Sequence, residues 1–218
     1  MKSEKKVAIV IGGTGVVGRE LVAQLAQAEH IGLVRSLTRR TIEYQDSKIE
    51  NHVIDFENLE ASRELFNGDV FFSCLGTTKK AAGSIQAQRR VDLDYQLACA
   101  ELAKQQGVQH ALLVSSSGAN RHSPMAYPKM KGQLEHALKQ LKFTRLTILQ
   151  PSLLLGTREK KRVGEELAAA ILPALTKLPG LRKARPIQGA QVAERMVQES
   201  LNDTAGSITL TLDEIFVD

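Results

Sequence analysis

Short apolar segments alternate along this chain with longer amphipathic ones. The first apolar segment, Val7–Ile11, is rich in β-branched residues, which is typical of a buried strand. From Val16 onward the apolar residues recur every three or four positions, which predicts a helix. The apolar positions of that helix are Val17, Leu21, Val22 and Leu25.

The same alternation continues to the end of the chain. Further strands are predicted at residues 32–38, 51–55, 69–76, 110–118, 145–151 and 207–212. Helices are predicted at 58–66, Gln86–Gln106 and Tyr127–Leu141, and within Glu165–Lys177 and Ala190–Leu201. In the longest helix, Val91, Tyr95, Ala98 and Leu102 are expected to form the stripe that packs on the sheet.

Strands that alternate with helices, and that are apolar on both faces, indicate a parallel sheet covered on both sides. We therefore expect an α/β fold, a Rossmann-type doubly wound parallel sheet. The 218 residues suit a single nucleotide-binding domain. Its cofactor-binding core should span 1–150, and 151–218 should form a small substrate-side appendage with the final strand.

Composition narrows the function classes. The net charge of +5 would suit nucleic acid, but aromatic residues are only 4% and Trp is absent, so no nucleic-acid partner is expected. No apolar run is long enough to cross a membrane, and residues 1–10 show neither the apolar stretch nor the cleavage site that a signal peptide would have. The two cysteines, Cys74 and Cys99, indicate no disulfide framework, and we expect a cytoplasmic protein.

The first strand and helix are joined by a glycine-rich turn. Gly12, Gly15 and Gly18 form the pattern G-x-x-G-x-x-G. Gly12 would allow the tight turn, Gly15 the approach of a pyrophosphate, and Gly18 close packing of helix on strand. Free N–H groups and the helix dipole favour an anion at such a site. A strand-to-helix turn without a ligand is the alternative interpretation, but the position of the motif favours a dinucleotide.

The end of the second strand selects the cofactor. An acidic residue there would bind the ribose 2′-OH of NAD, whereas this chain has Arg39 and Arg40. Two guanidinium groups match a 2′-phosphate. The sequence therefore predicts NADPH (NADP) as the cofactor.

A candidate catalytic group follows the fifth strand. Tyr127 and Lys131 are four residues apart, so they share one face of a helix. Lys131 would favour the phenolate form, Tyr127 would donate a proton to a carbonyl, and Ser116 would hold the carbonyl oxygen. Ser115 and Ser117 leave the choice of serine open, with Ser117 in reserve. Pro128 requires the helix to begin close to Tyr127.

These motifs resemble those of the atypical short-chain dehydrogenase/reductases. The branch that this chain resembles most contains the Tat-interacting protein 2, a metastasis-suppressor oxidoreductase, and its bacterial relatives. The glycine turn and Y-x-x-x-K belong to the whole superfamily, whereas CLGTT and R-x-x-x-R-x-G-E are more specific to the branch. The resemblance covers nearly the whole chain, through GGTGVVGREL, TRR, VIDFENL, CLGTT, RVDLDY, AELAKQQG, SSSGA, YPKMKG, LQPSLLLG and REKKRVGEE.

The resemblance implies a set of cofactor contacts. Thr14, Gly15, Val16 and Val17 would line the pyrophosphate, and Arg39 and Arg40 the 2′-phosphate. The remaining expected contacts are Gly12, Gly18, Asp55, Phe56, Leu75, Gly76, Thr77, Tyr127, Lys131, Leu154 and Arg162. Tyr127 and Lys131 also match the family's catalytic pair.

Other chemistry-bearing residues are expected to be structural. His110, His122 and His136 show no metal-ligand spacing, so no metal site is expected. Asp92 and Asp94 are interpreted as solvated or helix-packing groups. Cys74 is expected to be an inert core thiol.

Three functions fit these observations. The first is an NADPH-dependent oxidoreductase that acts on a small, unidentified carbonyl substrate. The second is an NADPH-binding regulator or redox sensor with little turnover, which would signal through a partner protein. The third is a sugar-nucleotide epimerase or dehydratase, although the segment after residue 151 is short for such an enzyme.

Overall fold

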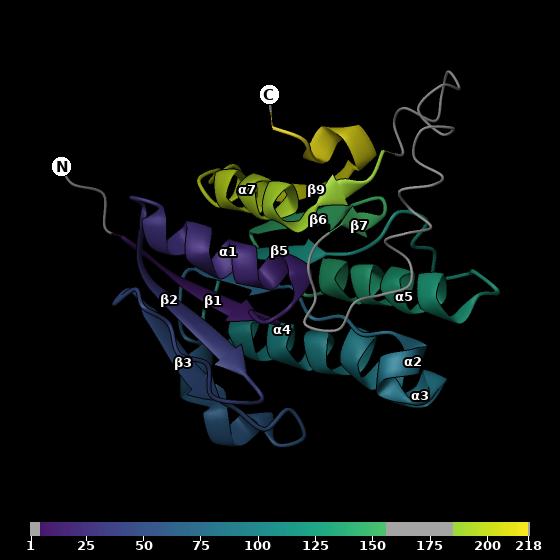
Figure 1. Ribbon diagram of the computed structural model, residues 1–218, viewed down its shortest axis with the longest axis horizontal. Coiled ribbons are helices and arrows are strands. Elements are labelled where there is room, and N and C mark those ends of the chain that lie inside the picture. The colour runs from purple at the N-terminus through teal and green to yellow at the C-terminus, as the bar shows by residue number, and fades with distance from the viewer. Residues whose placement is uncertain (1–4, 156–184, 218) are drawn as a thin grey trace.

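The computed structural model describes residues 5–155 and 185–217. Its centre is a seven-stranded sheet of order β3-β2-β1-β4-β5-β6-β9, in which each pair of neighbours is parallel (Figure 1). The strands are β1 (Lys6–Ile11), β2 (Ile31–Thr38), β3 (Ile49–Val53), β4 (Val70–Ser73), β5 (His110–Val114), β6 (Arg145–Gln150) and β9 (Gly206–Thr211). This order confirms the doubly wound sheet, because the chain builds outward from β1 in both directions.

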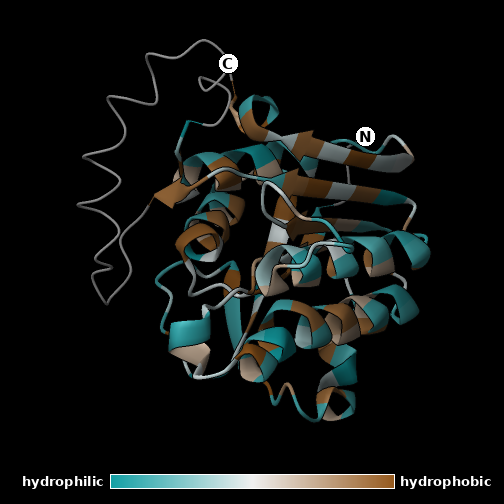
Figure 2. Cartoon of the chain, turned by 90° about the vertical axis from the view of Figure 1, so that its right-hand side faces the viewer, coloured by the Kyte–Doolittle hydropathy of each residue, from teal (hydrophilic) through white to brown (hydrophobic). Residues whose placement is uncertain are grey.

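Helices cover both faces of the sheet. One face carries α1 (Val16–Gln27) and α7 (Gly189–Glu199), and the other carries α4 (Tyr95–Gln105) and α5 (Ala126–Gln140) (Figure 1). The shorter elements are η1 (Leu59–Phe66), α2 (Lys79–Ala82), α3 (Ile85–Arg89), η2 (Arg90–Asp94), β7 (Leu154–Leu155), β8 (Ile187–Gln188) and η4 (Leu212–Ile215). Figure 2 shows apolar strands between helices whose outer faces are largely hydrophilic.

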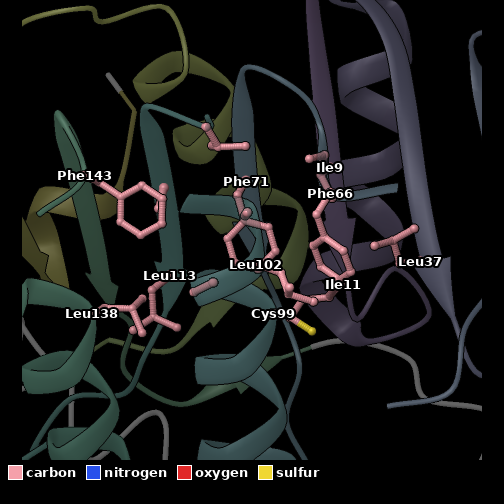
Figure 3. Packing of buried hydrophobic residues seen from close by; sticks show 14 of the residues in the cluster. Ile9, Ile11, Leu37, Phe66, Phe71, Cys99, Leu102, Leu113, Leu138 and Phe143 are labelled. Carbon is pink, nitrogen blue, oxygen red and sulfur yellow. The ribbon is translucent and has the colours of Figure 1, made fainter. Parts of the chain in front are cut away.

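The alternation of side chains along β1 explains why this strand is apolar throughout. Ile9 and Ile11 belong to the cluster on the α4 and α5 face, which Figure 3 shows with Phe66 and Phe71. Ala8 and Val10 belong instead to the cluster under α1 and α7. Neither face of β1 meets water, so neither set of positions can be polar.

Residues 185–217, the described part of the C-terminal segment, add one helix and one strand to the layers built by the rest of the chain. α7 packs beside α1 within one cluster, and β9 pairs in register with β6. The helix predicted within Glu165–Lys177 and the expected cofactor contact Arg162 lie outside the described residues. Within residues 5–155 and 185–217, no helix is long and apolar enough to cross a membrane.

The long helix predicted from Gln86 to Gln106 contains a π-helical turn, η2, in which the Tyr95 N–H donates to the Arg90 carbonyl. Of the expected inward stripe, Leu102 is buried, and the half-buried Tyr95 and Ala98 pack against the apolar cluster on this face of the sheet. Val91 is also only half-buried, whereas Asp92 and Gln96, which were not expected in the stripe, are fully buried. The Gln96 side chain donates to the carbonyls of Val91 and Asp92 and accepts from Ser73 Oγ. It therefore satisfies carbonyl groups within the π-turn.

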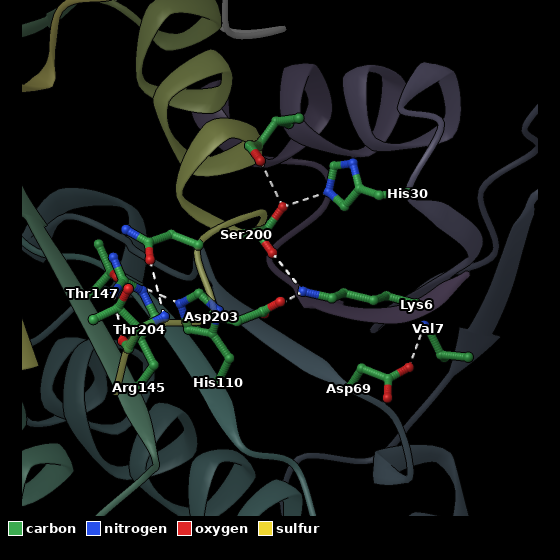
Figure 4. A network of polar contacts seen from close by, with 12 residues as sticks. Lys6, Val7, His30, Asp69, His110, Arg145, Thr147, Ser200, Asp203 and Thr204 are labelled. Carbon is green, nitrogen blue, oxygen red and sulfur yellow. Dashed lines mark hydrogen bonds and ion pairs between the residues drawn. The ribbon is translucent and has the colours of Figure 1, made fainter. Parts of the chain in front are cut away.

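A polar network connects α7 and the segment after it to the amino-terminal ends of the strands (Figure 4). Lys6 Nζ donates to Asp203 at 2.7 Å and to the Ser200 carbonyl at 3.0 Å. Arg145 lies 2.7 Å from both Glu199 and the Thr204 carbonyl. The amino-terminal ends of the strands lie on the opposite side of the sheet from their carboxyl ends, where ligands of such sheets bind. We therefore assign the network a structural role.

Candidate functional site

The turn between β1 and α1 depends on two of its glycines for purely structural reasons. Gly12 has φ +80°, and a Cβ there would lie 2.5 Å from the Cys74 backbone carbon. A Cβ on Gly18 would lie 2.1 Å from the Gly12 carbonyl oxygen. Gly12 therefore permits the turn, and Gly18 lets α1 pack against it.

Gly15 differs from these two glycines. It is the N-cap of α1, with φ −77° and ψ 176°, a conformation open to any residue, and no side chain caps the helix there. A Cβ on Gly15 would lie 3.3 Å from the Gly12 oxygen, a tight but tolerable contact. Beyond it lies the hollow that two pockets share. A small residue at Gly15 thus keeps the helix N-terminus open to an anionic ligand.

The first pocket runs from the glycine turn to the end of β2, with a volume of about 460 Å³. Arg39 and Arg40 line it and are exposed, and their guanidinium groups make no hydrogen bond or ion pair within the described residues. The other expected contacts that line this pocket are Gly12, Thr14, Gly15, Phe56, Leu75, Gly76 and Thr77. Asp55 is exposed, lies outside the lining of both pockets, and accepts the Glu57 N–H.

The second pocket, of about 760 Å³, continues from the same glycine turn. Ser116, Tyr127 and Lys131 line it together. Other expected contacts in its lining are Gly15, Val16, Val17, Leu75, Gly76, Thr77 and Leu154. The two pockets lie along the carboxyl ends of β1 and β4, where the order of the doubly wound sheet reverses.

Helix α5 positions Tyr127 and Lys131. It begins at Ala126, so Pro128 falls in the first turn, where the missing N–H has no intrahelical role. Tyr127 is 39% exposed, whereas Lys131 is 3% exposed, one turn further along. A Cβ on Gly132 would lie 2.2 Å from the Arg121 backbone nitrogen. This glycine therefore lets the loop before α5 pack directly on the helix.

The three consecutive serines have different surroundings. Ser115 is buried and donates to Glu135, which also accepts two hydrogen bonds from Gln150. Ser117 is exposed, and its N–H donates to the Pro151 carbonyl. The half-buried Ser116 Oγ makes only a 3.3 Å contact with the Ser117 carbonyl. All three serines line the second pocket, and the hydroxyl of Ser115 is already engaged by Glu135, so Ser116 and Ser117 offer the hydroxyl groups that are available to a ligand.

The sequence left two interpretations of Asp92 open; the structure excludes a solvated carboxylate and supports a helix-packing one, because Asp92 is fully buried between the π-turn and α5. Its Oδ1 lies 3.6 Å from Lys131 Nζ, and its Oδ2 accepts the Thr77 N–H at 3.2 Å. Lys131 Nζ also donates to the Val114 carbonyl at 3.4 Å. Burial raises the pKa of Asp92, and the Lys131 ammonium opposes that shift. Asp92 thus joins the lysine to the loop after β4.

Asp94, two residues along the same π-turn, is exposed and lies 3.6 Å from Arg89, which agrees with a solvated group. Burial raises the pKa of Cys74 to about 12, so its thiol stays protonated at neutral pH. Among residues 5–155 and 185–217, no group of three His, Cys, Asp or Glu side chains is placed to hold a metal.

The site has the features that a dinucleotide needs. The open helix N-terminus at Gly15 can receive a pyrophosphate, and the first pocket continues from it to the end of β2, where it is lined by Arg39 and Arg40. The opposite end holds a phenol, an ammonium group and a hydroxyl in one pocket. Such a set can bind a carbonyl oxygen and exchange a proton with it.

Comparisons with known proteins agree with this geometry. The sequence profile described as NAD(P)H-binding matches residues 12–201. "Protein HTATIP2" of Rattus norvegicus is 36% identical over 178 residues, which cover 80% of this chain and 73% of that protein. "Protein FMP52, mitochondrial" of Eremothecium gossypii is 32% identical over 206 residues, which cover 93% and 92%.

Solved structures share the fold at low identity. A short chain dehydrogenase from Leptospira borgpetersenii with bound NAD+ superposes with a TM-score of 0.72 at 16% identity, and the match covers 98% of this chain and 93% of that one. MoeE5 in complex with UDP-glucuronic acid and NAD gives 0.72 at 15% identity and covers 94% and 75%. At this identity the likeness establishes the Rossmann fold, and the sugar nucleotide belongs to the neighbour.

Proposed function

The chain belongs to the NAD(P)H-binding family and, within it, to the atypical short-chain dehydrogenase/reductases, and from that premise we propose that it is an NADPH-dependent oxidoreductase of small carbonyl compounds. The observation that carries the proposal is that Ser116, Tyr127 and Lys131 line one pocket, next to the glycine turn. A phenol and a hydroxyl in that pocket supply the proton donor and the hydrogen bond that reduction of a carbonyl needs.

The choice of NADPH over NADH rests on Arg39 and Arg40. Both side chains line the far end of the cleft, and their guanidinium groups make no hydrogen bond or ion pair within the described residues. A 2′-phosphate would offer that partner, with charge-assisted hydrogen bonds that a ribose hydroxyl cannot match.

When bound in this cleft, a reduced nicotinamide would supply the hydride that the reduction of a carbonyl carbon requires. Ser116 donates a hydrogen bond to the carbonyl oxygen and orients it. Tyr127 donates its phenolic proton to the same oxygen as negative charge develops there. The Lys131 ammonium, held by Asp92 and the Val114 carbonyl, stabilises the phenolate that remains and binds the nicotinamide ribose.

The test combines binding with turnover. NADPH affinity would be measured by calorimetry, and a panel of aldehydes and ketones would be screened by the loss of NADPH absorbance. Tyr127→Phe should keep NADPH affinity within about threefold and lower turnover by at least about 100-fold. Ser116→Ala should lower turnover more than Ser117→Ala, whose side chain lines the same pocket; the reverse order would assign the role to the reserve serine.

Two outcomes would change the proposal. If Tyr127→Phe kept full activity on a substrate found in the screen, the proton would have to come from another group. If NADPH bound tightly and no carbonyl compound were reduced, the regulatory role with a protein partner would replace the enzymatic one.

A cytoplasmic location stays a prediction, because the FMP52 relatives are named mitochondrial.

A further inference from the structure

The loop that carries Arg39 and Arg40 connects β2 to β3 and is held by side chains. Between residues 39 and 45 the described contacts include no backbone-to-backbone hydrogen bond. Instead, the Arg40 carbonyl accepts from Thr38 Oγ1 at 2.7 Å, and the Ile42 N–H donates to Asn51 Oδ1 at 2.8 Å. The position of both arginines therefore depends on the residues that make these contacts.

Asn51 on β3 is the centre of this arrangement. Its Nδ2 donates to Thr38 Oγ1 at 2.7 Å and to the Ser36 carbonyl at 3.1 Å, while its Oδ1 accepts from Ile42. The side-chain amide thus makes three hydrogen bonds, one to each side of the arginine pair and one to the strand that precedes it. Thr38, which accepts from Asn51, in turn donates a hydrogen bond to the Arg40 carbonyl.

The glycine turn is linked to the same loop on its other side. Ser36 Oγ lies 3.0 Å from Tyr44 Oη, and a Cβ on Gly13 would lie 2.6 Å from that Ser36 oxygen. A side chain at Gly13 would therefore displace the Ser36–Tyr44 contact. The loop is fixed between the turn that would hold the pyrophosphate and the amide of Asn51.

We propose that Asn51 is a positioning residue for the adenosine 2′-phosphate, which fixes the backbone of Arg39 and Arg40 so that their guanidinium groups converge on that phosphate. Asn51 touches no part of the cofactor itself, since it lies outside the lining of both pockets. This inference rests on the proposed use of NADPH. A determinant of cofactor choice would then lie on β3, a strand that supplies no charged side chain to the nucleotide.

The experiment measures the affinity of the full chain for NADPH and for NADH by calorimetry. In Asn51→Ala, NADPH affinity should fall by about 10-fold while NADH affinity changes by less than about twofold, because only the 2′-phosphate contacts depend on the loop. Thr38→Val keeps the β-branched shape and removes the bridging hydroxyl, so it should give the same pattern if Asn51→Ala folds poorly. His52→Ala, a neighbour on β3 whose ring bonds to Glu50 and not to the loop that carries the arginines, is the control.

The double variant Asn51→Ala/Thr38→Val should lose less NADPH affinity than the product of the two single losses, because the two substitutions share the Asn51–Thr38 hydrogen bond. An equal loss of NADPH and NADH affinity, or no loss of either, would overturn the role of Asn51 alone. Equal affinities of the parent chain for the two nucleotides would overturn the proposed cofactor as well, since no phosphate would then be gripped.

Discussion

Asp92 Oδ1 lies 3.6 Å from Lys131 Nζ, and both side chains are almost completely excluded from water. The distance is long for a hydrogen bond, and Asp92 Oδ1 has no other partner in the described structure. The lysine is therefore held by charge between Asp92 and the Val114 carbonyl, which leaves its ammonium group a direction open toward the pocket that it lines.

Replacement of Asp92 should destabilise the protein. In Asp92→Asn, the amide oxygen can still accept the Thr77 N–H, but Lys131 loses its buried counter-charge. We expect the free energy of unfolding, measured by urea titration, to fall by roughly 3 kcal/mol. Asp94→Asn on the same π-turn removes an exposed carboxylate and should change it by less than about 0.5 kcal/mol. Equal stabilities of the two variants would contradict the ion pair.

Removal of both arginines should erase the cofactor preference. Each charge-assisted hydrogen bond to the 2′-phosphate is worth roughly 1.5–3 kcal/mol. In Arg39→Ala/Arg40→Ala, NADPH affinity should therefore drop to about that of NADH, while NADH affinity stays near its parent value. A double variant that still prefers NADPH would place the phosphate elsewhere. The measurement is direct titration of each nucleotide.

The glycines of the turn should separate into two classes. Gly15→Val adds methyl groups toward the shared hollow, and its Cβ would lie 3.3 Å from the Gly12 oxygen and 3.7 Å from the Cys74 oxygen, so the chain should fold and lose nucleotide binding. Gly18→Val would place its Cβ 2.1 Å from that oxygen and should cost about 3 kcal/mol of unfolding free energy. Circular dichroism and NADPH titration distinguish the two effects. Unchanged binding in Gly15→Val would mean that this glycine serves the turn alone.

Acid should destabilise the fold through His110. Burial, followed by the nearby Arg145 and Lys6 charges, lowers the pKa of His110 from 6.5 to about 4, against a small opposing effect of Asp203. The folded state therefore binds this proton less readily than the unfolded state. The contribution of uncharged His110 to the free energy of unfolding is fully present above pH 6.5. It is lost progressively as the pH falls toward 4, and the total loss is up to about 3 kcal/mol.

The check is a comparison of two chains. The unfolding free energy of the parent chain and of His110→Gln would be measured at several pH values across this window. The difference between the two curves removes the contribution of the carboxylates, and the parent should lose more stability than the variant. Parallel curves would show that His110 titrates normally in the folded chain.

Much of the fold and part of the site could be predicted from the sequence because they follow from short-range patterns. The apolar run Val7–Ile11, the spacing of the three glycines and the arginine pair at the end of β2 each lie within a few residues. Likewise, Pro128 limits where α5 can begin, and the helix starts at Ala126.

The role of Asp92 could not be predicted, because it depends on a change of helical register. With ordinary α-helical spacing, Val91 and Tyr95 face the sheet. The i→i+5 hydrogen bond of the π-turn widens that spacing, so Gln88, Asp92 and Gln96 share the inner face instead. No local pattern of apolar residues predicts such a π-turn.

The contacts of Asn51 and the roles of the three serines were hidden for a different reason. Each depends on a partner distant in the chain, as Ser115 does on Glu135 and Asn51 on Ile42. Neighbouring residues of one type look equivalent in a sequence, and only the tertiary fold gives each a different neighbour.

The pairing of β9 with β6 has a consequence for biosynthesis. β6 is buried along nearly its whole length, and β9 covers its outer side. In a growing chain, β6 leaves the ribosome well before β9, so it first exists as an unprotected, apolar edge strand. Nascent chains would therefore be vulnerable to intermolecular pairing during translation until β9 docks, and this interval is where a chaperone would have most effect.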